Sequence, residues 1–283
     1  MRIEPKALTV DRLAPQTNRH WRPSWALQLA LGVHAVVLVL VIVWPRAWPA
    51  GLAALGVTHV LLAAAGLWPR SRVLGPNLTR VPQSATARQE VVLSFDDGPD
   101  PEVTPQVLDL LDRYGAKASF FCVATRAAQA PRCVAEIVRR GHSVENHSDR
   151  HSNFFAFNGY YGFRRELARA QATLQALTGR APMYFRAPMG IRNPLLDPAV
   201  VHSGLQYVSW TRRGYDAVER NPDAVLARLQ RNLAAGDILL LHDGHAARTR
   251  SGEPVVLAVL PRLLENLAMR GLKAVSLPMA LAS

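Results

Sequence analysis

Residues 91–99 read Val-Val-Leu-Ser-Phe-Asp-Asp-Gly-Pro, an apolar run that ends in two adjacent carboxylates and a Gly-Pro pair. The run predicts a buried strand over 91–95, and Gly-Pro predicts a turn directly after it. Two carboxylates at the end of a buried strand are costly to desolvate unless a cation lies beside them. Because adjacent residues at a strand end point in different directions, Asp96 and Asp97 can serve different partners, such as a metal ion and a water molecule. A solvated turn is the alternative, and the rest of the chain decides between the two.

Strands and helices alternate from residue 91 to the end of the chain. Seven strands are expected, at 91–95, 118–123, 143–146, 184–186, 205–210, 237–241 and 272–277. The helices expected between them lie at 105–114, 131–140, 162–177, 194–203, 222–234 and 255–270. Repeated strand–helix units predict a parallel sheet with helices outside, either an open sheet or a barrel.

Polar clusters follow five of these strands. They are Asp96-Asp97, His147 to His151, Arg186 to Pro188, Trp210 to Asp216, and His242-Asp243. The carboxyl ends of the strands of a barrel meet at one rim, where barrel enzymes carry their chemistry. A solvated surface does not explain five polar clusters on one rim, and we therefore expect a functional site there.

One of these clusters has the residues of a metal site. His147 and His151 are four residues apart, and on a helical turn such side chains share one face. Two imidazoles placed in this way form half of a metal site. Asp97 can supply an oxygen ligand and leave positions open for water and substrate, as a catalytic zinc site requires.

Other residues on the rim have the chemistry of proton transfer. Asp96 is the expected general base for the attacking water, and Arg186 can hold it ionised through a charge-assisted hydrogen bond. His242 ends an apolar run and is the expected general acid. Asp216, at the neighbouring strand end, would favour the imidazolium form of His242. A surface arginine and a satisfied core histidine are the alternatives, and the convergence of the clusters favours the catalytic roles.

The first quarter of the chain has a different composition. Residues 1–23 are polar and basic, and we expect them to be a poorly ordered tail. Two apolar runs follow within 24–68, each about as long as the 20 residues that span a bilayer and each bracketed by tryptophans. They predict a transmembrane helical hairpin, which a proline-containing linker, 69–89, joins to a catalytic domain, 90–283. One span followed by a buried or interfacial helix is the alternative, and a cleaved signal peptide fits less well.

The charge of the chain bears on its partners and its orientation. The net charge is +12, but there is no nucleic-acid-binding motif, so we expect a lipid bilayer and not a nucleic acid as partner. Arginines lie before the first span and after the second, whereas the turn between them holds only Arg46. By the positive-inside rule this predicts a multi-pass protein of the plasma (inner) membrane with its catalytic domain on the cytoplasmic face. Cys122 and Cys133 have no metal-type spacing, and the oligomeric state stays open.

Taken together, the motifs resemble those of the carbohydrate esterase family 4, or NodB-type, polysaccharide deacetylases, over residues 91–277. Four segments resemble the first, second, third and fifth motifs of that family, namely Ser-Phe-Asp-Asp-Gly-Pro at 94–99, His-Ser-x-x-His at 147–151, Arg-Ala-Pro at 186–188 and Leu-Leu-His at 240–242. The resemblance implies a distorted (β/α)7 barrel, here preceded by the two-helix hairpin. It also implies one divalent metal ion, with zinc as the first choice, held by Asp97, His147 and His151.

The resemblance further assigns roles on the rim. It implies Asp96 as the base, tethered by Arg186, and His242 as the acid, tuned by Asp216. Leu240 would lie beside the acyl methyl group. We expect Pro188, Met189 and Trp210 to contact the substrate as well.

Three positions depart from the family pattern. Met189 stands where the third motif usually has tyrosine. Arg213 and Ala217 stand where the fourth motif usually has an aspartate and a tryptophan. These departures leave the catalytic set intact but leave open the acyl group and the sugar.

The resemblance implies an enzyme that hydrolyses an N-acyl group, such as acetyl, from an amino sugar. Its substrate would be a glycan or, with the domain on the cytoplasmic face, a lipid-linked saccharide. One alternative is a polysaccharide deacetylase that faces the cell wall. Another is a membrane-tethered glycan-binding protein that has lost catalysis. A metal-dependent phosphatase is disfavoured because the chain has no phosphate-cradling glycine loop.

Overall fold

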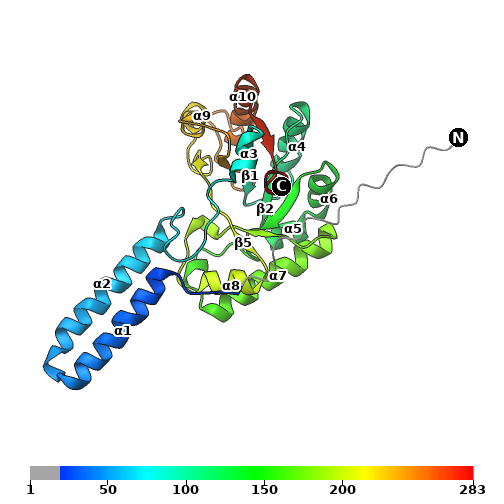
Figure 1. Cartoon of the computed structure of the whole chain (residues 1–283). Coiled ribbons are helices and arrows are strands. Elements are labelled where there is room, and N and C mark those ends of the chain that lie inside the picture. The colour runs from blue at the N-terminus through cyan, green and yellow to red at the C-terminus, as the bar shows by residue number, and fades with distance from the viewer. Residues whose placement is uncertain (1–19, 283) are drawn as a thin grey trace.

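The computed structural model describes residues 20–282 and shows an α/β domain from which a hairpin of two long helices projects (Figure 1). The basic tail expected over residues 1–23 lies outside the described residues as far as residue 19. Both large features of the sequence prediction, the hairpin and the strand–helix domain, are present.

The domain is built on one curled sheet of eight strands, in the order β5-β4-β3-β2-β1-β7-β6, with β8 paired to β1. All its strand pairs are parallel, which the repeated strand–helix units predicted. The strands are β1 (Glu90–Asp96), β2 (Ser119–Cys122), β3 (Ser143–Asn146), β4 (Tyr184–Phe185), β5 (Gln206–Tyr207), β6 (Arg212–Arg213), β7 (Ile238–His242) and β8 (Lys273–Val275). The expected distorted barrel is confirmed, with β6 as one strand more than the seven expected, because two residues are too few to show a period of two.

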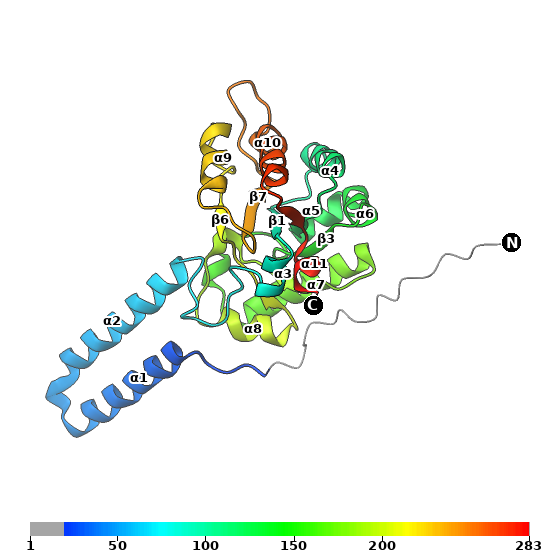
Figure 2. The same ribbon diagram turned by 45° about the horizontal axis from the view of Figure 1, so that its top comes forward.

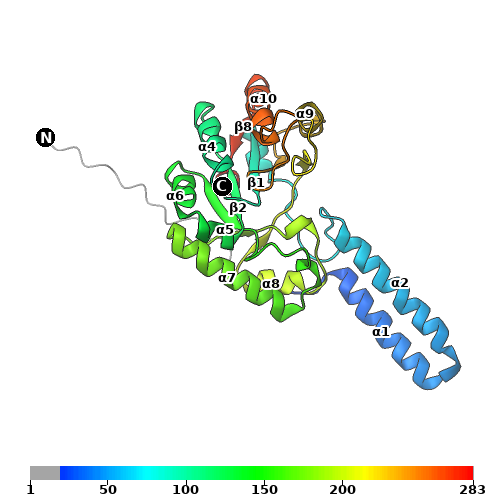
Figure 3. The same ribbon diagram turned by 180° about the vertical axis from the view of Figure 1, so that it is seen from behind.

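Helices cover the outside of this sheet. They are α4 (Val103–Arg113), α5 (Ala124–Gln129), α6 (Pro131–Arg139), α7 (Tyr160–Thr178), α8 (Leu196–His202), α9 (Pro222–Gln230) and α10 (Val255–Met269). Figure 3 shows α7 and α8 on one side of the sheet and α4, α9 and α10 on the other. Two short helices, α3 (Gln83–Ala87) and α11 (Leu277–Leu281), complete the domain. The sequence did not predict α3, α5 or α11, which are too short to show helical periodicity.

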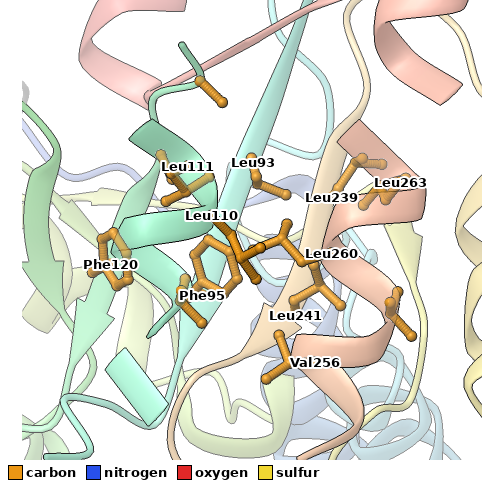
Figure 4. Packing of buried hydrophobic residues seen from close by; sticks show 14 of the residues in the cluster. Leu93, Phe95, Leu110, Leu111, Phe120, Leu239, Leu241, Val256, Leu260 and Leu263 are labelled. Carbon is orange, nitrogen blue, oxygen red and sulfur yellow. The ribbon is translucent and has the colours of Figure 1, made fainter. Parts of the chain in front are cut away.

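Alternation along the strands separates the outer core from the interior of the barrel. Leu93 and Phe95 of β1 point outward and pack with residues of α4 and α10 (Figure 4). Val92 points inward, into a second apolar cluster. Ser94 and Asp96 have the same parity as Val92 and therefore also face the interior. The inward face is thus apolar at the start of β1 and polar at its carboxyl end, where the site lies.

The hairpin consists of α1 (Trp25–Val43), a short 3₁₀ turn (Pro45–Ala47) and α2 (Trp48–Leu67). Both helices are long and apolar enough to cross a membrane, and only 6% and 11% of their apolar windows are buried. A core helix of a soluble domain would be mostly buried. The two helices pack closely at Gly51, where an added Cβ would lie 2.8 Å from Val37 Cγ1. His34 and His59 meet edge to face inside the hairpin, with ring centroids 5.2 Å apart.

The segment 69–89, expected as a linker, packs against the domain (Figure 2). Leu78 forms a parallel bridge to Val208, just after β5, and Arg80 forms an antiparallel bridge to Asp237, just before β7, so the segment contacts the sheet at both places. The buried Arg192 donates to the carbonyl oxygens of Ser71 and Gly75 at 2.6 and 3.2 Å.

The hairpin itself is fixed to the domain at one point of close contact. The backbone N–H of Arg192 donates to the carbonyl of Gly66, near the end of α2, at 3.1 Å. An added Cβ at Gly66 would lie 2.1 Å from the Arg192 carbonyl oxygen, so no larger residue fits there without movement. This contact joins the end of α2 directly to the domain.

Candidate active site

Asp96 and Arg186 form a buried ion pair at the rim of the barrel. Arg186 Nη1 lies 2.5 Å from Asp96 Oδ1. The same guanidinium donates to Ser94 Oγ at 3.1 Å and to the carbonyl of Ser209 at 3.0 Å, and it lies over the ring of Phe121 at 4.0 Å. Arg186 is fully buried, so its charge can be balanced only by these neighbours. They fix Asp96 through Oδ1 and leave Oδ2 for other partners.

Asp97, His147 and His151 meet next to this pair. The Nε2 atoms of His147 and His151 lie 3.2 and 3.0 Å from Oδ1 of Asp97. One ligand atom from each of the three residues lies within 4.8 Å of the others. The expected helical turn is wrong, because residues 147–151 form a loop after β3. The loop brings the imidazoles together with left-handed backbone at Ser148 (φ 69°) and His151 (φ 52°), conformations that cluster at functional sites.

The protonation of His147 tests whether these residues fit a metal ion. Its Nδ1 lies 2.9 Å from the carbonyl oxygen of Arg186, which can only accept, so Nδ1 carries the proton of the neutral ring. Nε2 of His147 then turns a lone pair toward Oδ1 of Asp97. That oxygen is buried and has no hydrogen-bond partner within residues 20–282. Electron-pair donors that face one another in this way are suited to share a cation, and the residues therefore fit a metal ion.

His242 and Asp216 form a second buried pair on the rim. His242 Nδ1 lies 2.9 Å from Asp216 Oδ1, and the backbone N–H of His242 donates to Asp216 Oδ2 at 2.7 Å. This leaves Nε2 of His242 as the ring nitrogen free for a substrate. Burial opposes a charge on His242, but the carboxylates around it, first Asp216 and then Asp96 and Asp97, together outweigh burial and raise the pKa of the imidazole. The parallel register places His242 directly beside Asp96.

The four residues expected to contact substrate have different environments. Leu240 is buried and lies two residues before His242, on the same inward face of β7. Pro188 is buried, whereas Met189 is 41% exposed and has a left-handed φ of 57°. Trp210 is buried, with its ring 6.0 Å from the Arg186 guanidinium. Leu240 is thus close to His242 and Trp210 to Arg186, whereas Pro188 and Met189 follow Arg186 by two and three residues in the chain.

The sequence did not assign a role to Asp243 or Ser94. Asp243 is buried and accepts a hydrogen bond from Thr104 Oγ1 at 2.6 Å. An added Cβ at Gly98 would lie 2.2 Å from its carboxylate, so only glycine lets the Asp97–Gly98 loop approach it. Ser94 Oγ bridges Arg186 and the carbonyl of Leu239, which is 2.7 Å away. In the sequence, only position could have indicated a role for these two residues. Ser94 lies on the inward face of one predicted strand, and Asp243 lies just past the carboxyl end of another.

Comparison with known proteins agrees with this geometry. The family model for polysaccharide deacetylases matches residues 83–208. A chitooligosaccharide deacetylase of Sinorhizobium fredii is 35% identical over 213 residues, which cover 71% of this chain and 96% of the relative. The chain belongs to the polysaccharide deacetylase family. The predicted resemblance is thereby confirmed, and this deacetylase is an enzyme, a hydrolase of the carbohydrate esterase family 4 type.

Further relatives of the deacetylase come from bacteria of other groups. A peptidoglycan-N-acetylglucosamine deacetylase of Bacillus cereus is 31% identical over 189 residues, covering 66% of this chain and 85% of the relative. The family 4 carbohydrate esterase from Streptomyces lividans, solved in complex with acetate, is 32% identical with a TM-score of 0.59, over 65% of this chain and 91% of that one. Each of these proteins matches the deacetylase over most of its own length.

Proposed function

We propose that the deacetylase hydrolyses an N-acyl group, acetyl in the simplest case, from an amino sugar in a glycan or a lipid-linked saccharide. The observation that carries this proposal is the convergence of a free carboxylate oxygen, a metal-type triad and a free imidazole nitrogen on one rim. These are Asp96 Oδ2, the set Asp97, His147 and His151, and His242 Nε2. The relatives support the substrate class, since their names specify chitooligosaccharide and peptidoglycan N-acetylglucosamine.

Asp97, His147 and His151 would hold one divalent metal ion, for which zinc is our first choice because two imidazoles and one carboxylate are a usual catalytic zinc set. When bound, such an ion supplies a Lewis acid that polarises the amide carbonyl and lowers the pKa of water. The carbonyl of Arg186 orients the His147 ring through Nδ1, as the outer partners of metal-binding histidines do.

The residues of the chain then divide the proton transfers between them. Asp96 accepts the proton of the attacking water at Oδ2, while Arg186 binds and orients the carboxylate through Oδ1. The backbone N–H of Met189 binds the developing oxyanion. His242 donates the proton at Nε2 to the leaving amine, and Asp216 keeps the ring oriented and protonated until then. Leu240 and Trp210 wall the acyl side of the pocket, and Pro188 shapes the turn before Met189.

The direct test of this function is hydrolysis of a simple N-acetylated amino-sugar oligomer by the metal-loaded, full-length protein. We expect release of acetate and of a free amine in equal amounts, with activity lost on chelation and restored by adding back the ion. Amine release without acetate would contradict the reaction. A metal-loaded protein that binds the oligomer but releases neither product would instead indicate a glycan-binding role.

The acid role of His242 predicts a shift in the pH profile of kcat/KM for Asp216→Asn. Burial lowers the pKa of His242 and the Asp216 carboxylate is the first of the groups that raise it, so removal of Asp216 should lower that pKa although Asp96 and Asp97 remain. The imidazolium is then lost at lower pH, and the limb by which activity falls at high pH should move to lower pH. As a control, His242→Asn should remove this limb and lower kcat by about 10²- to 10⁴-fold. An unchanged limb in Asp216→Asn would exclude His242 as the acid.

We further propose that the hairpin, 24–68, anchors the catalytic domain, 90–283, to the plasma (inner) membrane, and that 69–89 joins them. The excess of arginine outside the hairpin turn supports a cytoplasmic position for the domain. A fluorescent reporter that matures only in the cytosol, fused after Ser283, should therefore be bright, and a periplasm-dependent phosphatase fused there should be inactive. The opposite pair of results would place the domain outside and favour a cell-wall polymer as substrate.

A further inference from the structure

A second concave region lies where the hairpin meets the domain. This cavity has a volume of about 660 Å³ and opens between the carboxyl end of α2 and the sheet edge at β6. Figure 2 shows the end of α2 beside β6. Leu67, the last residue of α2, and Trp68, which follows it, line one side, and Trp210 and Tyr215 line the other. Segments about 145 residues apart in sequence thus build one cavity, which we call the arginine cavity for the reason that follows.

Five arginines and no acidic residue line the arginine cavity within the described chain. They are Arg70, Arg212, Arg213, Arg228 and Arg231. Arg212 and Arg228 form ion pairs with Asp237 and Glu219, at 3.1 and 3.0 Å. The other three make no ion pair within residues 20–282. The cavity therefore keeps an excess of positive charge, which favours an anionic ligand.

Arg213 is the best-positioned of the unpaired arginines. Its guanidinium lies 5.2 Å from the ring centroid of Trp210 and 4.9 Å from that of Tyr215. Its Nε is buried and has no hydrogen-bond partner among the described residues. With no ion pair of its own, the Arg213 side chain can place its guanidinium charge toward a ligand in the cavity. A planar guanidinium held between aromatic rings matches the geometry of phosphate oxygens.

The arginine cavity shares its walls with the catalytic site. The Trp210 ring that faces Arg213 also lies 6.0 Å from the guanidinium of Arg186, which holds Asp96. Tyr215 directly precedes Asp216, the partner of His242. Only the Trp210 side chain would therefore separate a ligand in the arginine cavity from the Arg186–Asp96 pair of the catalytic site.

The level of the arginine cavity along the hairpin indicates which kind of anion it would bind. The apolar span of α2 ends at Leu67, and the exposed Trp68 follows it, as interfacial tryptophans do. The cavity begins at this level, where the phosphates of membrane lipids lie. Its apolar wall on α2 and its arginines on the domain suit a ligand that has a lipid chain on one side and a charged group on the other.

We propose that the arginine cavity binds the phosphate through which a membrane lipid carries the N-acylated amino sugar. The substrate class of the deacetylase is then a lipid-phosphate-linked amino sugar, held by its phosphate while the sugar extends to the rim. This inference rests on the proposed deacetylation. It also gives a physical reason for Arg213, which stands where the resemblance to the family's fourth motif would put an aspartate.

The test compares two substrates that differ only in the phosphate. One is an N-acetylated amino sugar on a short prenyl phosphate, and the other is the same sugar as an uncharged alkyl glycoside. Metal-loaded, full-length protein in phosphatidylcholine nanodiscs should show a kcat/KM at least about 10-fold higher for the phosphate-linked substrate. Arg213→Gln should lower this ratio by about 10-fold or more, toward equal kcat/KM for the two substrates, as expected for loss of a charge-assisted hydrogen bond.

Two further variants distinguish loss of phosphate binding from a general effect of the substitution on folding. Arg231→Gln changes an exposed side chain of the cavity and should also lower the ratio. Arg262→Gln removes the same charge from an exposed pair with Asp223, outside the cavity, and should leave the ratio unchanged. Binding of a sugar-free prenyl phosphate, measured by calorimetry, should weaken in Arg213→Gln and not in Arg262→Gln.

Four results would overturn the inference. If both substrates are hydrolysed with equal kcat/KM, or if Arg213→Gln leaves the ratio unchanged, the cavity does not bind the substrate phosphate, although the deacetylase function stands. If Arg213→Gln changes activity on both substrates alike, and only when phosphatidylglycerol is added to the nanodiscs, the cavity binds a bilayer headgroup instead. If neither substrate releases acetate, the proposed function fails and this inference fails with it.

Discussion

Asp96→Asn should lower kcat by about 10²- to 10⁴-fold while leaving the bound metal in place. Asparagine is nearly isosteric and can still accept from Arg186 through its amide oxygen, so the pocket keeps its shape. The amide nitrogen that replaces Oδ2 cannot accept a proton from water. Because Asp97, His147 and His151 are untouched, the metal content measured by mass spectrometry should equal that of the wild type.

The same substitution should lower the stability of the protein. Arg186 is fully buried, and Asp96 is the carboxylate that balances its charge. Breaking a buried pair by removing one partner costs about 3–5 kcal/mol, so we expect a clearly lower midpoint of thermal unfolding. Asp223→Asn, which breaks an exposed pair with Arg262, should cost less than about 1 kcal/mol and serves as the control. Full activity in folded Asp96→Asn would show that another group takes the proton.

His151→Ala should remove the metal and, with it, the activity. Loss of an outer partner of a metal ligand typically costs 10- to 100-fold in affinity, and loss of a ligand should cost more than about 100-fold. His151 lies in a loop and is partly exposed, so its truncation should leave the fold intact. Metal content after dialysis against a metal buffer is the primary measurement, and activity at saturating metal is the second.

The control for His151→Ala is His202→Ala, which removes an imidazole from α8, away from the rim. His202→Ala should keep both metal and activity. If dialysed His151→Ala retained the ion, the ligand set would differ from the one proposed. If it lost the ion but kept its activity, the ion would have no part in the hydrolysis.

The rim could be predicted from sequence because a parallel sheet brings the carboxyl ends of its strands together. Once residues 91–99 are placed as a strand and a turn, the positions of Asp96, Arg186 and His242 can be predicted, because each lies at the carboxyl end of a predicted strand. The geometry of His147 and His151 could not be predicted. Their spacing suggested a helical turn, whereas a loop with left-handed backbone places them, and no periodicity marks such a loop.

Contacts between distant segments are the part that the sequence does not reveal. Ser94 reads as an ordinary strand serine until Arg186 is seen beside it. The composition of residues 69–89 suggested a linker, but Arg192, more than 100 residues later, binds its carbonyl groups and fixes it to the domain. The arginine cavity is assembled in the same way, from residues that no local pattern connects.

The contact between Gly66 and Arg192 has a consequence for how the enzyme meets its substrate. A domain on a free tether would sample a hemisphere of solution, whereas this one is fixed to the end of α2. With the hairpin in a bilayer, the rim would stay at one height and sweep a plane as the protein diffuses. Its encounters would then scale with the number of substrate molecules per unit of membrane area and not with their concentration in the surrounding solution.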